Sequence, residues 1–255
     1  MQIGADTPAV VTGAAGGLGE ATARALAARG AKVTVLDMKA EDGERVAGEI
    51  GGIFVSTDVT SDESVSAALA QARAAHGQER ICVNCAGIAP AGKVVGRDGP
   101  HDMALFQTVI NVNLVGTMRV MSMSAAGMAA AEPVTEDGER GVVINTASIA
   151  AYEGQMGQAA YAASKGGVVG LTLPAARDLS RNGVRVMAIA PGTFGTPMLR
   201  GLPQDVQDSL AQQVPFPVRL GDPAEFGELA CFLAETRYMN GSVVRVDGAL
   251  RMGVK

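Results

Sequence analysis

The sequence predicts an α/β protein that folds as one domain around a doubly wound parallel sheet. Short apolar runs that fit buried strands alternate with stretches rich in alanine and leucine that fit helices. Glycines and polar residues directly follow several of these runs, where the carboxyl ends of parallel strands meet. The chain has 255 residues, enough for one such domain with a sizeable core. We therefore expect a single domain over residues 1–255, with its ligand site at the carboxyl edge of the sheet.

Composition excludes several classes of function. The formal net charge is −5 and no run of like charge is present, so no basic surface for nucleic acid is expected. No uncharged apolar run approaches the roughly 18 residues of a membrane span. Residues 1–9 resemble neither a secretory signal nor a basic transit peptide, so the cytoplasm is the expected compartment. Cys82 and Cys85 lie roughly 10 Å apart along a strand, too far for a disulfide, and no second pair completes a zinc site. We expect no metal.

The first strand, turn and helix have the pattern of a nucleotide site. An apolar run at residues 9–11 meets a glycine-rich turn, and an alanine and leucine helix then reaches to about residue 29. Glycines let the backbone turn tightly and approach a pyrophosphate, while the helix N-terminus supplies amide donors. The spacing is Gly-x-x-x-Gly-x-Gly, and the placement between strand and helix carries the prediction in a chain with 33 glycines. The candidate glycines of this turn are Gly13, Gly16, Gly17 and Gly19.

The second strand, at residues 32–37, ends on Asp37, which lies 18 residues after Gly19. In nucleotide-binding folds of this kind, an acid at this place accepts hydrogen bonds from the adenosine ribose and repels a 2′-phosphate. Asp37 therefore favours NAD over NADP. The alternative is a strand-end aspartate that caps the following helix.

Two further strands carry small or polar residues at their ends. The third, at residues 53–55, is followed by Asp58 and Val59, which are placed to flank an adenine, and then by a helix over 61–75. The fourth, at 81–83, opens into small residues that let the backbone approach a cofactor: Asn84, Cys85, Ala86 and Gly87. A loop at 89–103, rich in glycine and proline, precedes a helix over 104–128 that contains Asn113. An asparagine there also has a simpler explanation, in which its side chain bonds to neighbouring backbone.

The fifth strand leads to the residues with the clearest chemistry. Residues 142–144 form a short apolar run, Ser148 follows it, and Tyr161 and Lys165 stand four apart on the next helix. This spacing puts ammonium and phenol on one helix face, where a cation lowers the phenol pKa from its ordinary value near 10. Such a tyrosine exchanges a proton with an alcohol or carbonyl oxygen while Ser148 hydrogen-bonds the same oxygen. The alternative is a chance pair on a half-exposed helix face.

The last third of the chain is expected to cover the site. Pro174 should kink the helix over 158–180, because it removes a backbone donor. A sixth strand at 185–190 leads to Pro191 and Gly192, and an apolar, proline-punctuated segment at about 193–220 has the composition of a substrate lid. Ordinary packing is the alternative for that segment. A last strand covers 243–247.

In their order along the chain, these motifs resemble the short-chain dehydrogenase/reductase family. The resemblance spans nearly the whole chain and rests on Thr12-Gly13-x-x-x-Gly17-x-Gly19, Asn84-x-Ala86-Gly87, Asn113, Ser148, Tyr161-x-x-x-Lys165 and Pro191-Gly192. It implies a seven-stranded Rossmann sheet, a nicotinamide cofactor and Tyr161 as the acid/base with Ser148 as its partner. It also implies that Lys165 lowers the tyrosine pKa and binds the nicotinamide ribose, and that Asn113 holds a water in a proton relay.

Longer strings, such as Gln213-Val-Pro-Phe-Pro217, resemble members of this family that oxidise (S)-3-hydroxyacyl-CoA to 3-oxoacyl-CoA in fatty acid metabolism. That resemblance implies a homotetramer, a substrate contact at Gln155, and NAD contacts at Gly16, Leu18, Asp37, Asp58, Val59, Cys85, Phe194 and Thr196. The phosphates of CoA need cations, for which Lys93, Arg97 and Arg200 are candidates. Three alternatives stay open: an NADPH-dependent 3-oxoacyl thioester reductase, a hydroxysteroid dehydrogenase and a cofactor-binding scaffold without catalysis.

Overall fold

A computed structural model describes residues 1–97, 99–201 and 203–254. Its centre is a seven-stranded sheet in the order β3-β2-β1-β4-β5-β6-β7, and every pair of neighbouring strands is parallel. The predicted doubly wound sheet is therefore confirmed. The strands are β1 Pro8–Thr12, β2 Lys32–Asp37, β3 Ile53–Ser56, β4 Ile81–Asn84, β5 Gly141–Thr146, β6 Val184–Pro191 and β7 Val243–Val246.

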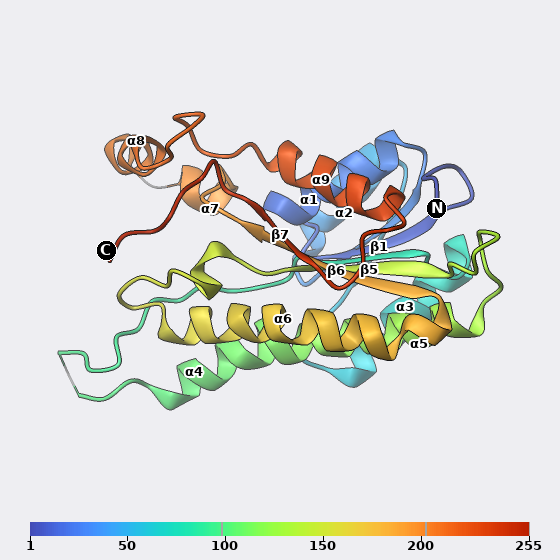
Figure 1. Ribbon diagram of the computed structural model, residues 1–255, viewed down its shortest axis with the longest axis horizontal. Coiled ribbons are helices and arrows are strands. Elements are labelled where there is room, and N and C mark those ends of the chain that lie inside the picture. Colours follow the sequence, from blue (N-terminus) through green and yellow to red (C-terminus); the bar gives the residue numbers. More distant parts are fainter. Residues whose placement is uncertain (98, 202, 255) are drawn as a thin grey trace.

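Helices cover both faces of the sheet (Figure 1). The upper layer in that view holds α1 Gly17–Ala28, α2 Ala40–Ile50 and α9 Pro223–Glu235. The lower layer holds α3 Asp62–His76, α4 Met103–Ile110, α5 Thr117–Ala130 and α6 Ala159–Asp178. Short elements complete the chain: η1 Asn111–Gly116, η2 Ile149–Ala151, η3 Ser180–Asn182, α7 Pro197–Arg200 and α8 Gln204–Gln212. No helix among the described residues is long and apolar enough to cross a bilayer.

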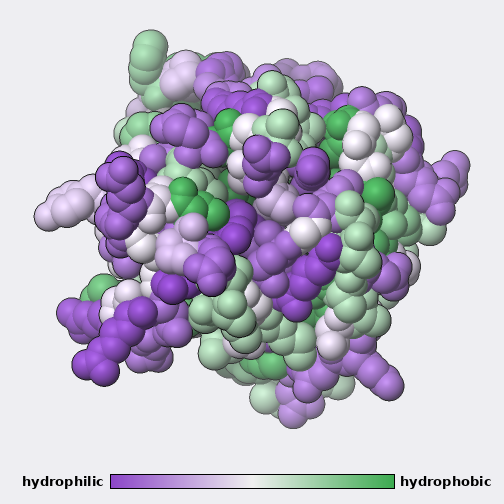
Figure 2. Space-filling view, turned by 90° about the vertical axis from the view of Figure 1, so that its right-hand side faces the viewer, coloured by the Kyte–Doolittle hydropathy of each residue, from purple (hydrophilic) through white to green (hydrophobic). Residues whose placement is uncertain are grey.

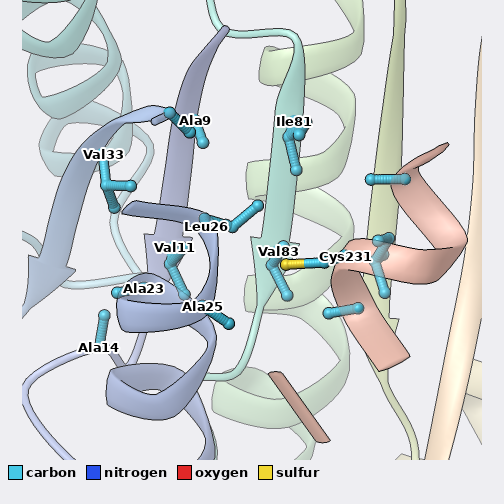
Figure 3. Packing of buried hydrophobic residues seen from close by; sticks show 14 of the residues in the cluster. Ala9, Val11, Ala14, Ala23, Ala25, Leu26, Val33, Ile81, Val83 and Cys231 are labelled. Atoms are coloured by element: carbon cyan, nitrogen blue, oxygen red, sulfur yellow. The ribbon is translucent and has the colours of Figure 1, made fainter. Parts of the chain in front are cut away.

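Small side chains let the upper helices pack closely on the sheet. Leu26 of α1 and Cys231 of α9 point toward β1 and β4, beside Val11 and Val83 (Figure 3). Leu26 is fully buried, and burying such a side chain stabilises the fold by about 2 kcal/mol. A Cβ on Gly227 would lie 2.7 Å from a backbone oxygen of α1, so α9 needs a glycine there to come this close.

The carboxyl and amino ends of the strands form two opposite edges of the sheet. All strands run in one direction, so their carboxyl ends meet at the left in Figure 1, with the 89–103 loop, α7 and α8. The amino ends face the viewer in Figure 2, where hydrophilic and hydrophobic side chains are interspersed over the surface. The residues that the sequence singled out therefore gather at one edge.

Two features differ from the sequence predictions, the π-helical turn and helix α9. The helix expected over 104–128 contains a π-helical turn, Asn111–Gly116, between α4 and α5. Pro174 lies inside α6, which continues on both sides of it as the predicted helix over 158–180 does; the kink at Pro174 stays a prediction. Helix α9 was not predicted, although its start carries a capping box in which Asp222 and Glu225 bond each other's backbone amides.

Candidate active site

The carboxyl ends of β1 and β4 are joined where the strand order reverses, the place where such sheets bind ligands. The hydroxyl of Thr12 accepts hydrogen bonds from the backbone amides of Cys85 and Ala86, at 3.1 and 3.2 Å. Gly13 follows with φ +65°, and a Cβ there would lie 2.7 Å from the Ala86 amide nitrogen. A residue with a side chain at position 13 would therefore push the two strand ends apart.

The glycines of the turn have separate tasks. A Cβ on Gly19 would lie 2.2 Å from the Gly13 carbonyl oxygen, so Gly19 lets α1 pack against the turn. Gly17 has φ +58°, which favours glycine. Around Gly16 nothing in the protein lies within 4 Å of an added Cβ, so the fold itself does not require a glycine there. Leu18 packs against the core below the turn.

Asp37 ends β2 with its carboxylate turned to the glycine loop. One carboxylate oxygen accepts the amide of Ala15 and the other accepts the amide of Lys39, both at 3.0 Å. Helix α2 has Lys39 as its N-cap with no side-chain cap, and Asp37 bonds the amide of this N-cap residue but none in the first turn of the helix. Each oxygen of Asp37 keeps a lone pair for a ribose hydroxyl.

The two residues expected to flank an adenine are engaged within the protein. The Asp58 carboxylate accepts bonds from the amide and hydroxyl of Thr60, at 2.8 and 2.7 Å, and these bonds lower the pKa of Asp58. The Val59 side chain is buried, and a Cβ on Gly116 of the π-turn would lie 2.8 Å from it. Both residues follow the end of β3, where Asp58 is half-buried and Val59 is buried.

The structure brings Ser148, Tyr161 and Lys165 together beyond the end of β5. Ser148 begins η2, and its hydroxyl oxygen accepts the amide of Ala150 at 3.1 Å. The Ser148 hydroxyl lies near enough to the Tyr161 phenol to oppose part of the rise in the pKa of that phenol. On the same face of α6, Lys165 Nζ lies 5.8 Å from the centre of the Tyr161 ring and donates to the Thr146 carbonyl oxygen at 2.7 Å.

Burial dominates the electrostatics of this group, which corrects the expectation from the sequence. Burial raises the pKa of Tyr161, and the nearby Ser148 hydroxyl opposes that rise in part. Burial also lowers the pKa of Lys165 from 10.5 to about 8. The expected lowering of the tyrosine pKa by the ammonium does not hold here, because Nζ is turned to the Thr146 carbonyl and both groups are desolvated.

Asn113 lies in the π-turn and is fully buried. Its side-chain oxygen accepts the amide of Ile88 at 2.8 Å, and its Nδ2 donates to the Ile88 carbonyl at 2.8 Å and to the Ser164 hydroxyl at 3.0 Å. A Cβ on Gly87 would lie 3.2 Å from the Asn113 side-chain oxygen and 3.7 Å from Lys165 Nζ. The Asn113 side chain thus bonds the backbone of Ile88, 25 residues away in sequence, and not backbone next to it in its own helix, so the simpler explanation does not hold. These bonds join residues 84–88 to the helix of Tyr161.

The predicted cofactor contacts at the end of β4 are bonded within the protein. Asn84 is buried and donates to the Asn145 side-chain oxygen at 2.8 Å, and the Cys85 thiol hydrogen-bonds the Thr146 hydroxyl at 3.4 Å. Burial raises the pKa of Cys85 to about 11, so its thiol stays protonated. Cys85, Cys82 and Cys231 are free thiols. Among the described residues, no group of three or more His, Cys, Asp and Glu could hold a metal ion.

The segment after β6 begins close to the glycine turn. Pro191 is buried at the strand end, and Gly192 packs so closely that a Cβ would lie 2.8 Å from the Asp247 Cα. Phe194 is buried in an edge-to-face contact with Phe226, 6.4 Å between ring centres, so its ring serves the core. The Thr196 methyl would lie 3.6 Å from a Cβ on Gly17.

The expected lid, residues 193–220, forms α7, α8 and a loop with exposed apolar side chains. Phe216 is 81% exposed and Val218 is 63% exposed, while Val214 is buried. Leu202 lies outside the described residues. Behind this segment is a hollow of about 740 Å³ that Arg200 and Gln204 line, and a smaller one of about 500 Å³ adjoins Gly17 and Arg200. Neither hollow is lined by Ser148, Tyr161 or Lys165.

The cations proposed for phosphates lie on two sides of the site edge. Lys93 and Arg97 are exposed residues of the 89–103 loop, in which Val95 and Pro100 form an isolated antiparallel bridge. Arg200 belongs to α7 and donates to the Gly195 carbonyl at 2.8 Å. Gln155 lies in the 149–158 loop, where its backbone amide donates to the Gln158 side chain at 3.0 Å.

Sequence reasoning missed several residues that hold the site. Ser164 donates to the Tyr161 carbonyl at 2.7 Å and accepts from Asn113, so it fixes the first turn of α6. The carbonyl oxygen of Thr146 anchors Lys165. Glu153 pairs with Arg245 across the fold. No local pattern signals these contacts, because each joins residues that are distant in sequence or uses backbone oxygen.

Comparison with known proteins agrees with this geometry. The profile of the family described as Enoyl-(Acyl carrier protein) reductase matches residues 13–250. The chain is 53% identical to 3-hydroxyacyl-CoA dehydrogenase type-2 of Bos taurus, over 96% of this chain and 95% of the relative, and 52% identical to that of Homo sapiens, over 96% and 95%. The crystal structure of 3-hydroxyacyl-CoA dehydrogenase type-2 from Mycobacterium avium superposes with a TM-score of 0.94 at 49% identity and covers 98% of both chains. The chain belongs to the short-chain dehydrogenase/reductase family.

Proposed function

We propose that this enzyme oxidises (S)-3-hydroxyacyl-CoA to 3-oxoacyl-CoA with NAD, as part of fatty acid metabolism in the cytoplasm. The observation that carries the proposal is the convergence of Ser148, Tyr161 and Lys165 beside the place where the strand order reverses. The relatives suggest the substrate class. Their names include 3-hydroxyacyl-CoA dehydrogenase, and about half of their residues are identical to those of this chain over nearly its full length. The stereochemistry rests on that resemblance alone.

The residues around the glycine turn fit a dinucleotide. Gly16 leaves open space where a side chain would stand, and the N-terminus of α1 presents free amides toward it. Asp37 lies next to this turn, held by the Ala15 amide, with its negative charge facing the position of an adenosine ribose. In our proposal the cofactor contacts are the turn glycines, Asp37, Asp58, residues 84–87, the Pro191–Gly192 turn and Thr196.

The same contacts favour NAD over NADP. A 2′-phosphate on the adenosine ribose would bring negative charge against Asp37, and residues 14–17 offer no basic side chain to balance it. Lys39 is nearby, but its side chain is exposed. This arrangement counts against the alternative of an NADPH-dependent 3-oxoacyl thioester reductase.

When bound, the nicotinamide supplies the acceptor for a hydride. The residues of this chain handle the proton and hold the reacting oxygen. Ser148 hydrogen-bonds the substrate hydroxyl, and Tyr161 takes its proton as the carbonyl forms. To accept this proton, Tyr161 must first be the phenolate, and it becomes the phenol as the proton moves. The Lys165 ammonium, 5.8 Å from the ring centre, is the cation placed to offset part of the cost of the buried phenolate before that transfer. Asn113 holds the Ile88 backbone and the first turn of α6 in fixed positions through its hydrogen bonds to Ile88 and Ser164.

The acyl chain and CoA need separate surfaces. The lid at residues 193–220 offers exposed Phe216 and Val218 to an apolar chain. Gln155 in the 149–158 loop is our candidate for a substrate contact. Lys93, Arg97 and Arg200 are the candidates for the CoA phosphates, because the protein as a whole carries net charge −5 and a polyanion needs a local cluster of cations.

A homotetramer is part of the proposal, and helices α5 and α6 are its expected contact surface. Met118, Val115 and Leu173 are partly exposed apolar residues on or beside these helices. Of the small residues in the region, Ala126, Ala163 and Gly170 are exposed and can meet a second subunit. Ala125 is buried, and Gly167 packs within the chain, since a Cβ there would lie 2.6 Å from Leu114.

A substrate panel tests this function. Purified enzyme with NAD should oxidise (S)-3-hydroxybutyryl-CoA and longer homologues, with slower or no turnover of the (R) forms, of hydroxysteroids and with NADP. Turnover of a hydroxysteroid without any 3-hydroxyacyl-CoA would favour the steroid alternative. No turnover with either class would revive the scaffold alternative.

A further inference from the structure

One guanidinium at the end of β7 joins segments that border the candidate site. The terminal nitrogens of Arg245 donate to the two carboxylate oxygens of Glu153, both at 2.9 Å. Its Nε donates to Asp247 at 2.6 Å, and one terminal nitrogen also reaches the Leu250 carbonyl at 3.2 Å. The side chains of Arg245 and Glu153 are 23% and 24% exposed. Bidentate pairs of this kind, partly shielded from water, are stronger and more specific in geometry than ordinary surface ion pairs.

Glu153 belongs to the loop of residues 149–158, which we call the site loop. This loop leaves Ser148 and returns to Tyr161 through α6, and it also carries Gln155. Besides the ion pair, the guanidinium carbon lies 5.2 Å from the centre of the Tyr152 ring, a cation–π contact with the same loop. The site loop is therefore held on the end of β7 through two consecutive residues.

The other partners of Arg245 begin the C-terminal segment, residues 247–254. Figure 1 shows this red segment leaving β7 toward the edge that carries α7 and α8. It touches the site loop again, where the Met156 amide donates to the Val254 carbonyl at 3.1 Å. It also touches the lid, where the Phe216 amide donates to the Gly248 carbonyl at 3.3 Å.

Apolar contacts follow the same route. Ile149 of the site loop, Val214 of the lid and Leu250 of the C-terminal segment form one small buried cluster, apart from the main core. A hollow of about 210 Å³ lies between the lid and the end of β7, lined by Val214 and Gly248 among others. The C-terminal segment and this cluster thus connect the lid to the site loop.

Neither Glu153 nor Arg245 takes part in the proposed proton transfer, so the ion pair between them has another role. The simplest role is to stabilise the fold. That role alone does not explain why the partly exposed pair joins the site loop to the C-terminal segment, which in turn contacts the lid, while a separate and buried pair, Arg185 with Glu139 at 2.8 Å, holds the opposite edge of the sheet.

We infer that Arg245 and Glu153 are positioning residues that set the site loop, and with it Ser148 and Gln155, against the lid. Substrate affinity then depends on the pair more strongly than cofactor affinity does, because the glycine turn, Asp37 and the end of β4 lie outside the connected segments and only Gly192 and Thr196 of the proposed cofactor contacts lie in or beside them. This inference rests on the proposed function, since it concerns the surface that takes the acyl substrate.

The test compares Glu153→Gln and Arg245→Lys, singly and together, with Glu139→Gln as the matched control at the far edge. We expect each variant of the pair to raise KM for (S)-3-hydroxyacyl-CoA by about tenfold, which corresponds to about 1.4 kcal/mol of lost substrate binding. The Kd for NADH, from fluorescence titration, should stay within about twofold. The double variant should be no worse than the worse single variant. Glu153→Asp should recover part of the loss, and Glu139→Gln should lower Tm without changing KM.

Hydrogen exchange read by mass spectrometry gives an outcome that needs no substrate. In Glu153→Gln, exchange should rise together in residues 149–158, 214–216 and 247–254. A rise confined to 149–158, or KM values unchanged in active variants, would overturn the inference. Failure of the unmutated enzyme to turn over any 3-hydroxyacyl-CoA would instead refute the proposed function, and the exchange data would still decide the inference.

Discussion

Burial of Lys165 should give the protein a pH-dependent stability that one substitution removes. Its pKa falls from 10.5 to about 8 on folding, because desolvation disfavours the ammonium. At about 1.4 kcal/mol for each tenfold change in proton affinity, this costs about 3 kcal/mol below pH 8. The unfolded chain binds more protons than the folded protein between the two pKa values, so stability should rise with pH in that window. About 2 kcal/mol of the cost should be relieved between about pH 7 and pH 9.5.

The assay is denaturant unfolding of the unmutated protein and of Lys165→Met over that pH range. The buried thiols act in the opposite direction at high pH, because burial raises the pKa of Cys82 to about 12 and that of Cys85 and Cys231 to about 11. Both proteins contain these thiols, so the difference between their unfolding free energies isolates Lys165. The difference should change by about 2 kcal/mol in favour of the unmutated protein as pH rises. A difference that is constant with pH would refute the reasoning.

Other consequences can be tested separately. Asp37→Ser should shift kcat/KM toward NADP, and an unmutated enzyme that uses both cofactors equally would contradict the role of Asp37. Gly16→Ala should fold normally, because no protein atom lies within 4 Å of the added Cβ, yet it should weaken NADH binding; unchanged affinity in a titration would remove Gly16 from the site. Replacing Lys93 and Arg97 with alanine should raise KM for acetoacetyl-CoA, more at low salt, and leave a neutral hydroxysteroid unaffected; equal losses on both would mean that the loop acts by shape. Light scattering should give the mass of a tetramer, and a monomer at micromolar concentration would exclude it.

The sheet could be predicted because each strand is an apolar run with a clear end. The run of apolar residues and the turn residues that follow it are local signals, so the sequence indicates the positions of all seven strands. Their parallel direction follows from the alternation of strands with helices. The π-turn could not be predicted in this way. It depends on Asn113 bonding the Ile88 backbone and on Gly116 fitting against Val59, and both are contacts between distant parts of the chain.

The positions of the candidate residues could be predicted better than their electrostatics. The spacing of Tyr161 and Lys165 correctly puts them on one helix face, but it carries no information on burial. In the structure desolvation outweighs the nearby charge, so the Tyr161 pKa rises and the Lys165 pKa falls. Likewise, the sequence places Phe194 after β6 without revealing that its ring packs on Phe226.

The central claim is that the reacting proton passes through the Tyr161 phenol. Stopped-flow and steady-state kinetics of Tyr161→Phe with (S)-3-hydroxyacyl-CoA and NAD, together with titration of NADH, test it most directly. Because positioned acid/base groups contribute on the order of 10²- to 10⁴-fold, kcat should fall by at least about 100-fold while the Kd for NADH stays within about twofold. A kcat within about tenfold of the unmutated enzyme would contradict the account.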